Sequence, residues 1–88
     1  MDDQKRPSLG DAKRLEFLGA QMRQARKRRG LLLRHVARHL GVTVPLVHAY
    51  EFGEVHIPVL RFLELADFVG LDTGLLSRRR ILRERAAA

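Results

Sequence analysis

Residues 31–52 read LLLRHVARHLGVTVPLVHAYEF, which is two short apolar-patterned segments on either side of a glycine. In the first segment, apolar residues recur at steps of three and four positions, a spacing that predicts a helix with one buried face. Gly41 is expected to end this helix, because glycine adopts the backbone conformation of a helix C-terminus at little cost. The apolar residues are Leu33, Val36, Ala37 and Leu40.

The second segment carries the signals of a new helix. Thr43 can accept a free backbone N–H as an N-cap, and Pro45 lies in the first turn, where its missing N–H costs nothing. Val47 and Tyr50 are one turn apart and are expected to face inward together, and Gly53 ends the helix. Two short helices joined by a tight glycine turn are the helix-turn-helix pattern.

Further helices are predicted on both sides of this pair. Upstream, an apolar stripe starts at Leu15, and the helix ends at Gly30. Downstream, Pro58 opens a helix that runs to about Val69. Together with a last helical segment, these elements predict an all-α fold, a compact four- to five-helix bundle. The upstream stripe is Leu15, Leu18, Met22 and Ala25, with Arg23, Lys27 and Arg28 on the opposite side.

The 88 residues are the length of one domain. We expect residues 1–14 to be a flexible basic arm, residues 15–76 to be the helical domain, and residues 77–88 to be a basic helical tail. The absence of cysteine excludes a disulfide framework and a Cys-ligated zinc site. No apolar stretch is long enough for a membrane span, and the N-terminal residues lack the apolar core of a secretory signal, so a cytoplasmic protein is expected.

The charge balance points to a polyanionic partner. The net charge is +7, from 17 Lys and Arg against 10 Asp and Glu, and the pI is about 11.3. A small domain with this charge attracts polyanions, of which nucleic acid is the most common. The composition therefore favours nucleic-acid binding.

The helix expected at 58–69 is apolar nearly all round. Leu60 and Phe68 fall within or beside its polar stripe, and a helix with two apolar sides is usually buried on both. A homodimer through Leu60, Phe68, Leu75 and Leu76 is the prediction, and the alternative is that the C-terminal segment folds back over the helix. The broad apolar face is Val59, Phe62, Leu63, Ala66 and Val69, opposite Arg61, Glu64 and Asp67.

Residues 18–58, LGAQMRQARKRRGLLLRHVARHLGVTVPLVHAYEFGEVHIP, resemble the Cro/C1-type (XRE-family) helix-turn-helix domain of phage repressors and bacterial regulators, and the resemblance extends to about Leu76. It implies a globule of four or five helices whose third helix enters the major groove, with two copies on a two-fold operator in double-stranded DNA. It also implies a structural ion pair between Arg26 and Glu51. A bacterial or phage-encoded, nucleoid-associated protein is expected.

The chain departs from the family pattern at the positions that contact DNA. Leu32 and Leu33 stand where Ser or Asn and then Gln are usual, which removes a helix cap and a phosphate-holding side chain. Phe52 stands where a phosphate-binding Asn is common. The base-reading positions correspond to Val44, Pro45, Leu46 and Ala49. None of these can hydrogen-bond a base edge, although apolar contact with thymine methyl groups is open to them.

Other side chains can still hold a duplex. Most of their contacts would position the DNA on its phosphates, so readout is expected to depend on methyl contacts and DNA shape. The predicted function is a sequence-specific DNA-binding transcriptional regulator, a repressor. The expected contacts are Thr43, His48, Arg34, Arg38, His56 and Arg61.

Two alternatives stay open. One is an antitoxin that represses its own operon and binds a toxin through an apolar face or tail. The other is a protein-interaction module in which Leu33, Val44, Leu46 and Phe52 form a binding patch. An enzyme is not expected: His35 and His39 have a metal-chelating spacing, but no third ligand accompanies them. No cofactor or metal is expected either.

Overall fold

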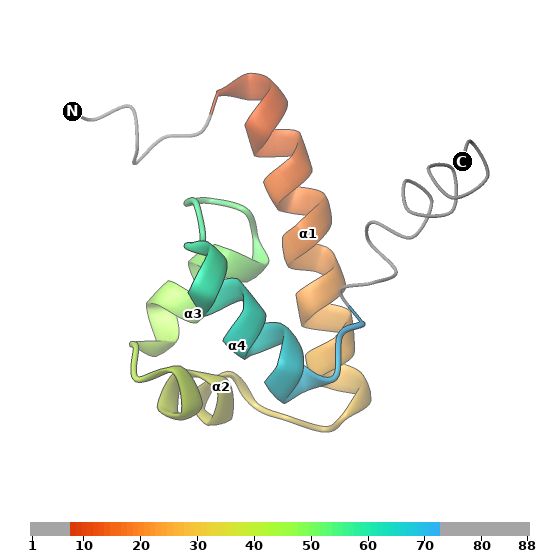
Figure 1. Ribbon diagram of the computed structural model, residues 1–88, viewed down its shortest axis with the longest axis vertical. Coiled ribbons are helices and arrows are strands. Elements are labelled where there is room, and N and C mark those ends of the chain that lie inside the picture. The colour runs from red at the N-terminus through yellow and green to blue at the C-terminus, as the bar shows by residue number, and fades with distance from the viewer. Residues whose placement is uncertain (1–7, 73–88) are drawn as a thin grey trace, which may run out of the picture.

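Four α-helices build the part of the chain that this computed structural model describes, residues 8–72 (Figure 1). They are α1 (Leu9–Arg28), α2 (Leu33–Leu40), α3 (Val44–Glu51) and α4 (Val59–Val69). The all-α prediction is confirmed. The expected tail at 77–88, together with Leu75 and Leu76, lies outside the described residues, as do residues 1–7 of the expected arm. Over residues 8–72, no helix is long and apolar enough to cross a membrane.

The first helix begins earlier than its apolar stripe indicates, at Leu9 rather than Leu15. Ser8 is its N-cap, and the Ser8 hydroxyl accepts a hydrogen bond from the Asp11 backbone N–H at 3.2 Å. A negative charge at Asp11 in the first turn also suits the positive end of the helix dipole. Residues 9–14 are therefore helical, because a capping signal starts the helix before its buried face begins.

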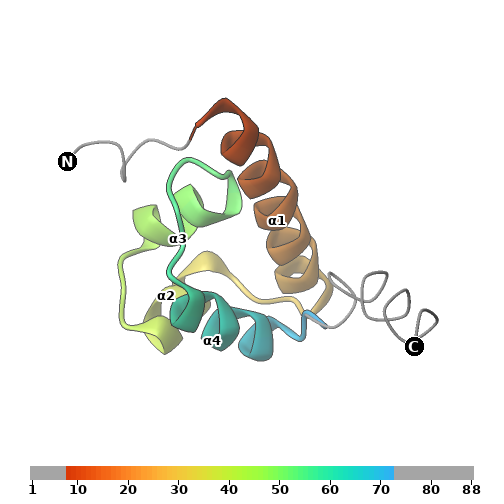
Figure 2. The same ribbon diagram turned by 45° about the horizontal axis from the view of Figure 1, so that its top comes forward.

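The helices enclose a common core. Figures 1 and 2 both show α1 along one side of the molecule with the three shorter helices beside it. Both α3 and α4 pack against α1 and α2. The apolar faces predicted for the first three helices supply most of the core, which consists of Met22, Ala25, Val36, Ala37, Leu40, Val47, Tyr50, Leu65 and Val69.

The turn between α2 and α3 follows the predicted signals. Gly41 has a φ of 70°, a conformation that strains any residue with a Cβ, and it closes α2. Thr43 then caps α3, since its Oγ1 accepts from the Leu46 backbone N–H at 3.3 Å. The end of α2 and the start of α3 are therefore set by these two residues, as predicted.

The buried face of α4 is rotated relative to the predicted one. Leu65, which the prediction left out, has no exposed surface, whereas Val59 is 71% exposed and Leu63 is 47% exposed. Ala66 and Val69 are buried as expected. At 100° per residue, the buried face spans Leu65 to Ala66 and centres near Val69. The prediction was wrong here because nearly every position of this helix is apolar, so the pattern alone does not choose a face.

Candidate nucleic-acid interface

The helix α3 has one buried face and one face open to solvent. Val47, Tyr50 and Glu51 point into the protein and are buried. On the opposite side, at 100° per residue, lie Pro45, His48, Ala49 and Phe52, and Val44 flanks them. Val44 and Phe52 are 39% and 44% exposed, Pro45 and His48 are exposed, and Ala49 is half-buried. Leu46 is half-buried beside the core. This outward face of α3 is the candidate interface.

A buried ion pair fixes α3 against α1. The Nε of Arg26 donates to Oε2 of Glu51 at 2.7 Å, and Nη2 donates to Oε1 at 3.1 Å. Arg26 Nη1 also donates to the Leu31 carbonyl at 2.9 Å. The guanidinium therefore joins the end of α1, the end of α3 and the segment leading into α2. The two residues that the resemblance pairs do form this bidentate contact.

The backbones of α1 and α3 touch at Gly19. A Cβ at this position would collide with the backbone carbonyls of Tyr50 and Glu51. Only glycine lets the two helices come this close, so the outward face of α3 is held by direct backbone packing as well as by the ion pair.

The start of α2 is capped from an unexpected residue. Leu32 is the N-cap and has no side-chain acceptor, as expected from its type. The backbone N–H of Leu32 nevertheless donates to Nδ1 of His35 at 2.9 Å. This is the returning half of a capping box, with imidazole in the place of the usual Glu or Gln. It requires an unprotonated Nδ1.

The predicted phosphate contacts divide into two groups. Arg34 and Arg38 are exposed and lie one turn apart on the outer side of α2, and His56 is exposed in the loop before α4. Arg61 is different: its Nη1 donates to the Leu40 carbonyl at 2.8 Å and to Oε1 of Glu64 at 3.2 Å. Arg61 thus provides a hydrogen-bond donor for the last carbonyl of α2 and links α4 to α2.

The two predicted dimer residues within the described part of the chain, Leu60 and Phe68, differ in exposure. Leu60 is 76% exposed, but Phe68 is half-buried, packs against the core and stacks on His39 with ring centroids 4.1 Å apart. Phe68 and His39 also line an open hollow of about 420 Å³ with Leu31, His35 and Arg38. In the described residues, no group of three or more His, Asp or Glu side chains is placed to hold a metal ion.

A contact missed by the sequence reading lies at the end of α3. Arg23, expected on the side of α1 away from the apolar stripe, is half-buried, with its guanidinium carbon 4.6 Å from the centroid of the Phe52 ring. Its Nη1 donates to the Glu51 carbonyl at 3.4 Å. Phe52 also stacks on His48 with centroids 4.5 Å apart. The spacing in the sequence could have indicated this contact. Arg23 lies one helical turn before Arg26 on the same face of α1, and Phe52 directly follows Glu51, the partner of Arg26.

Comparison with known proteins gives a family. The family model described as a helix-turn-helix domain matches residues 18–79, which is most of the chain. No curated protein and no solved structure matches the chain. The matched range includes α2, the turn, α3 and α4, and most of α1.

Proposed function

We propose that this chain, which belongs to the helix-turn-helix domain family, is a sequence-specific transcriptional repressor that inserts α3 into the major groove of DNA. Membership of the family indicates a DNA-binding regulator, because the helix-turn-helix motif places its second helix in the major groove. The observation that supports the finer proposal is the outward face of α3, held rigidly by the Arg26–Glu51 pair and the contact at Gly19.

Readout on this face is largely apolar. Val44, Pro45, Leu46 and Ala49 offer no hydrogen bond to a base edge, but they can contact thymine methyl groups in the major groove. Specificity then depends on methyl positions and on the shape and deformability of the site. His48 is the polar side chain on the face that can reach a base edge.

Phosphate contacts position the duplex. Arg34, Arg38 and His56 are exposed, and the Thr43 hydroxyl can donate to a phosphate while it accepts from the Leu46 backbone N–H. We include Arg61 with these, although its charge is shared with Glu64. Such contacts add affinity and salt dependence, but they carry no sequence information.

The repressor acts as a homodimer in the cytoplasm, on the nucleoid. Leu60 supports the dimer, because it forms an exposed apolar surface on α4 with Val59 and Leu63. Exposed apolar surface of this kind often marks a protein contact. Two copies would place two α3 helices on half-sites about one helical turn apart. Phe68 is half-buried against the core and His39, so the exposed part of the proposed contact on α4 is the surface around Leu60.

Fluorescence anisotropy with two duplexes tests the proposal. One duplex is the region upstream of the protein's own gene and the other is the same bases shuffled, each titrated at several salt concentrations. We expect a preference of about a thousandfold at physiological salt. Equal affinity for the two duplexes, with a steep dependence on salt, would mean that the protein recognises phosphates and not sequence. A reporter driven by the same upstream region is expected to fall when the protein is present.

The double substitution of Arg34 and Arg38 by Ala separates this proposal from a protein-binding module. Both side chains are exposed on α2, so the fold should survive, as circular dichroism can verify. DNA affinity is expected to drop with the fold intact. The exposed Val44 and Phe52 favour the protein-binding module as the second candidate, and it would be preferred if the wild-type protein bound neither duplex.

A further inference from the structure

We infer that Arg23 of α1 binds a DNA phosphate at the C-terminal end of α3, and that Phe52 holds its guanidinium in place for that contact. This inference rests on the proposed function and extends its interface to a third helix. Arg23 is a side chain of α1 that contacts the outward face of α3, through the Phe52 ring and the Glu51 carbonyl.

The guanidinium of Arg23 is held in position by two contacts. It lies 4.6 Å from the centroid of the Phe52 ring, and Nη1 donates to the Glu51 carbonyl at 3.4 Å. A cation over an aromatic face and a donor at a helix C-terminus are each favourable. Because these contacts already order the side chain, less conformational entropy is lost when it binds a ligand.

The charge of Arg23 is not neutralised by a carboxylate in residues 8–72. The carboxylate of Glu51 is bonded through both oxygens to Arg26, and Arg23 touches only the backbone carbonyl of that residue. A guanidinium has five N–H donors, so several stay available to a phosphate. Within residues 8–72, the charge of Arg23 thus stands beside the outward face of α3 without a carboxylate partner.

The place of Phe52 on α3 explains why a phosphate is the ligand. At 100° per residue, Phe52 and Pro45 lie together near the centre of the outward face, two turns apart. Helix-turn-helix docking puts the N-terminal residues of the recognition helix on base edges. The C-terminal end of the same helix then lies closer to the sugar-phosphate backbone, where Arg23 is poised.

Salt-dependent DNA binding by Arg23→Gln tests the inference. The slope of log affinity against log salt changes by about 0.9 for each phosphate contact, so it should become shallower by about that amount. Affinity should fall about tenfold for the upstream and the shuffled duplex alike, because a phosphate contact is independent of sequence. Arg23→Lys should keep the wild-type slope with intermediate affinity. Phe52→Leu should weaken binding to both duplexes, while the slope of log affinity against log salt stays close to that of the wild type.

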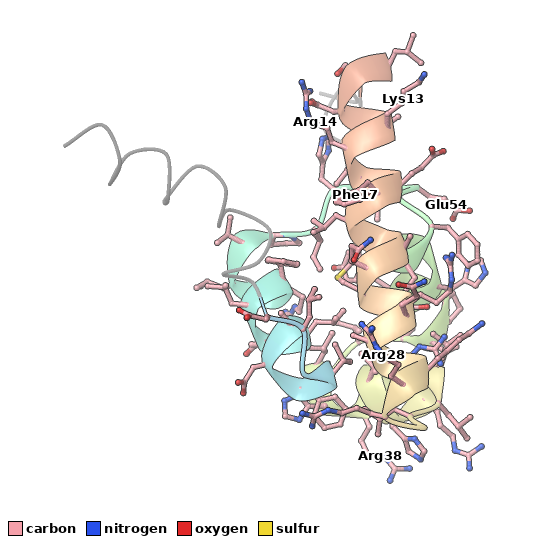
Figure 3. The ribbon with its side chains drawn as sticks, turned by 90° about the vertical axis from the view of Figure 1, so that its right-hand side faces the viewer. Lys13, Arg14, Phe17, Arg28, Arg38 and Glu54 are labelled. Atoms are coloured by element: carbon pink, nitrogen blue, oxygen red, sulfur yellow. The ribbon has the colours of Figure 1, made fainter. Side chains whose placement is uncertain are left out.

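Arg28→Gln is the matched control. It removes the same charge from the same helix, but Arg28 lies on the outer side of α1 with Lys13, Arg14 and Phe17 (Figure 3). Two results would overturn the role of Arg23 and leave the proposed function standing. One is a wild-type salt dependence of binding in Arg23→Gln, and the other is an equal change of salt dependence in Arg28→Gln. If Arg23→Gln does not fold, Arg23→Lys decides the question: wild-type affinity for both duplexes, or a shallower salt dependence, overturns the inference. A wild-type protein that binds neither duplex overturns both.

Discussion

Arg26 and Glu51 form a bidentate ion pair between the end of α1 and the end of α3, with Nε to Oε2 at 2.7 Å and Nη2 to Oε1 at 3.1 Å. Both side chains are buried, so each charge depends on the other for its solvation. The pair holds the orientation of α3, and with it every side chain of the outward face.

Glu51→Ala should destabilise the domain by about 3–5 kcal/mol, because it leaves the Arg26 charge buried without a partner. Urea denaturation measures this. Glu64→Ala is the control, since Glu64 belongs to an exposed i,i+3 pair with Arg61 and its loss should cost about 1 kcal/mol or less. Similar losses for the two variants would contradict a structural role for the buried pair.

Substitution by alanine should change the stability of the domain in opposite directions at two glycines of α1, Gly19 and Gly10. Gly19→Ala forces α1 away from the Tyr50 and Glu51 carbonyls and should cost about 1–3 kcal/mol. Gly10→Ala meets only Arg14 Nη1 at 3.6 Å, so it should stabilise the helix by about 0.5–1 kcal/mol. Thermal unfolding of the two variants gives the signs, and a Gly19→Ala variant as stable as wild type would refute the close packing of α1 on α3.

His35→Ala should remove the acceptor of the Leu32 backbone N–H and cost about 0.5–1 kcal/mol. His35→Gln should retain most of the stability, because Gln supplies the usual acceptor of a capping box at this position. Chemical denaturation of both variants tests the cap. Identical midpoints for wild type and His35→Ala would show that the imidazole contributes no capping bond.

Leu60→Asp should dissociate the proposed dimer without unfolding the domain, because Leu60 is 76% exposed within the chain. Phe68→Ala should instead lower the free energy of unfolding, since its ring packs on the core and on His39. Analytical ultracentrifugation at high micromolar concentration measures the first effect and thermal melting the second. A wild-type protein that stays monomeric at that concentration would rule out the dimer.

The sequence predicted most of the fold because its signals are local. Apolar spacing and a closing glycine mark α2, and Thr43 and Pro45 mark the start of α3. The same kind of signal was present at Ser8, yet the first helix was started at its apolar stripe, so its beginning was placed too late.

By itself, the sequence determined that the chain is all-α and where its two central helices and their turn lie, since periodicity, capping and glycine act between neighbours in the chain. Only the tertiary structure decided which face of α4 is buried, that Arg61 binds the Leu40 carbonyl, and that Arg23 lies on Phe52. A long cationic side chain can reach many partners, and an almost wholly apolar helix can pack on any side. The choice among those partners is made by the packing of helices that are distant in the sequence.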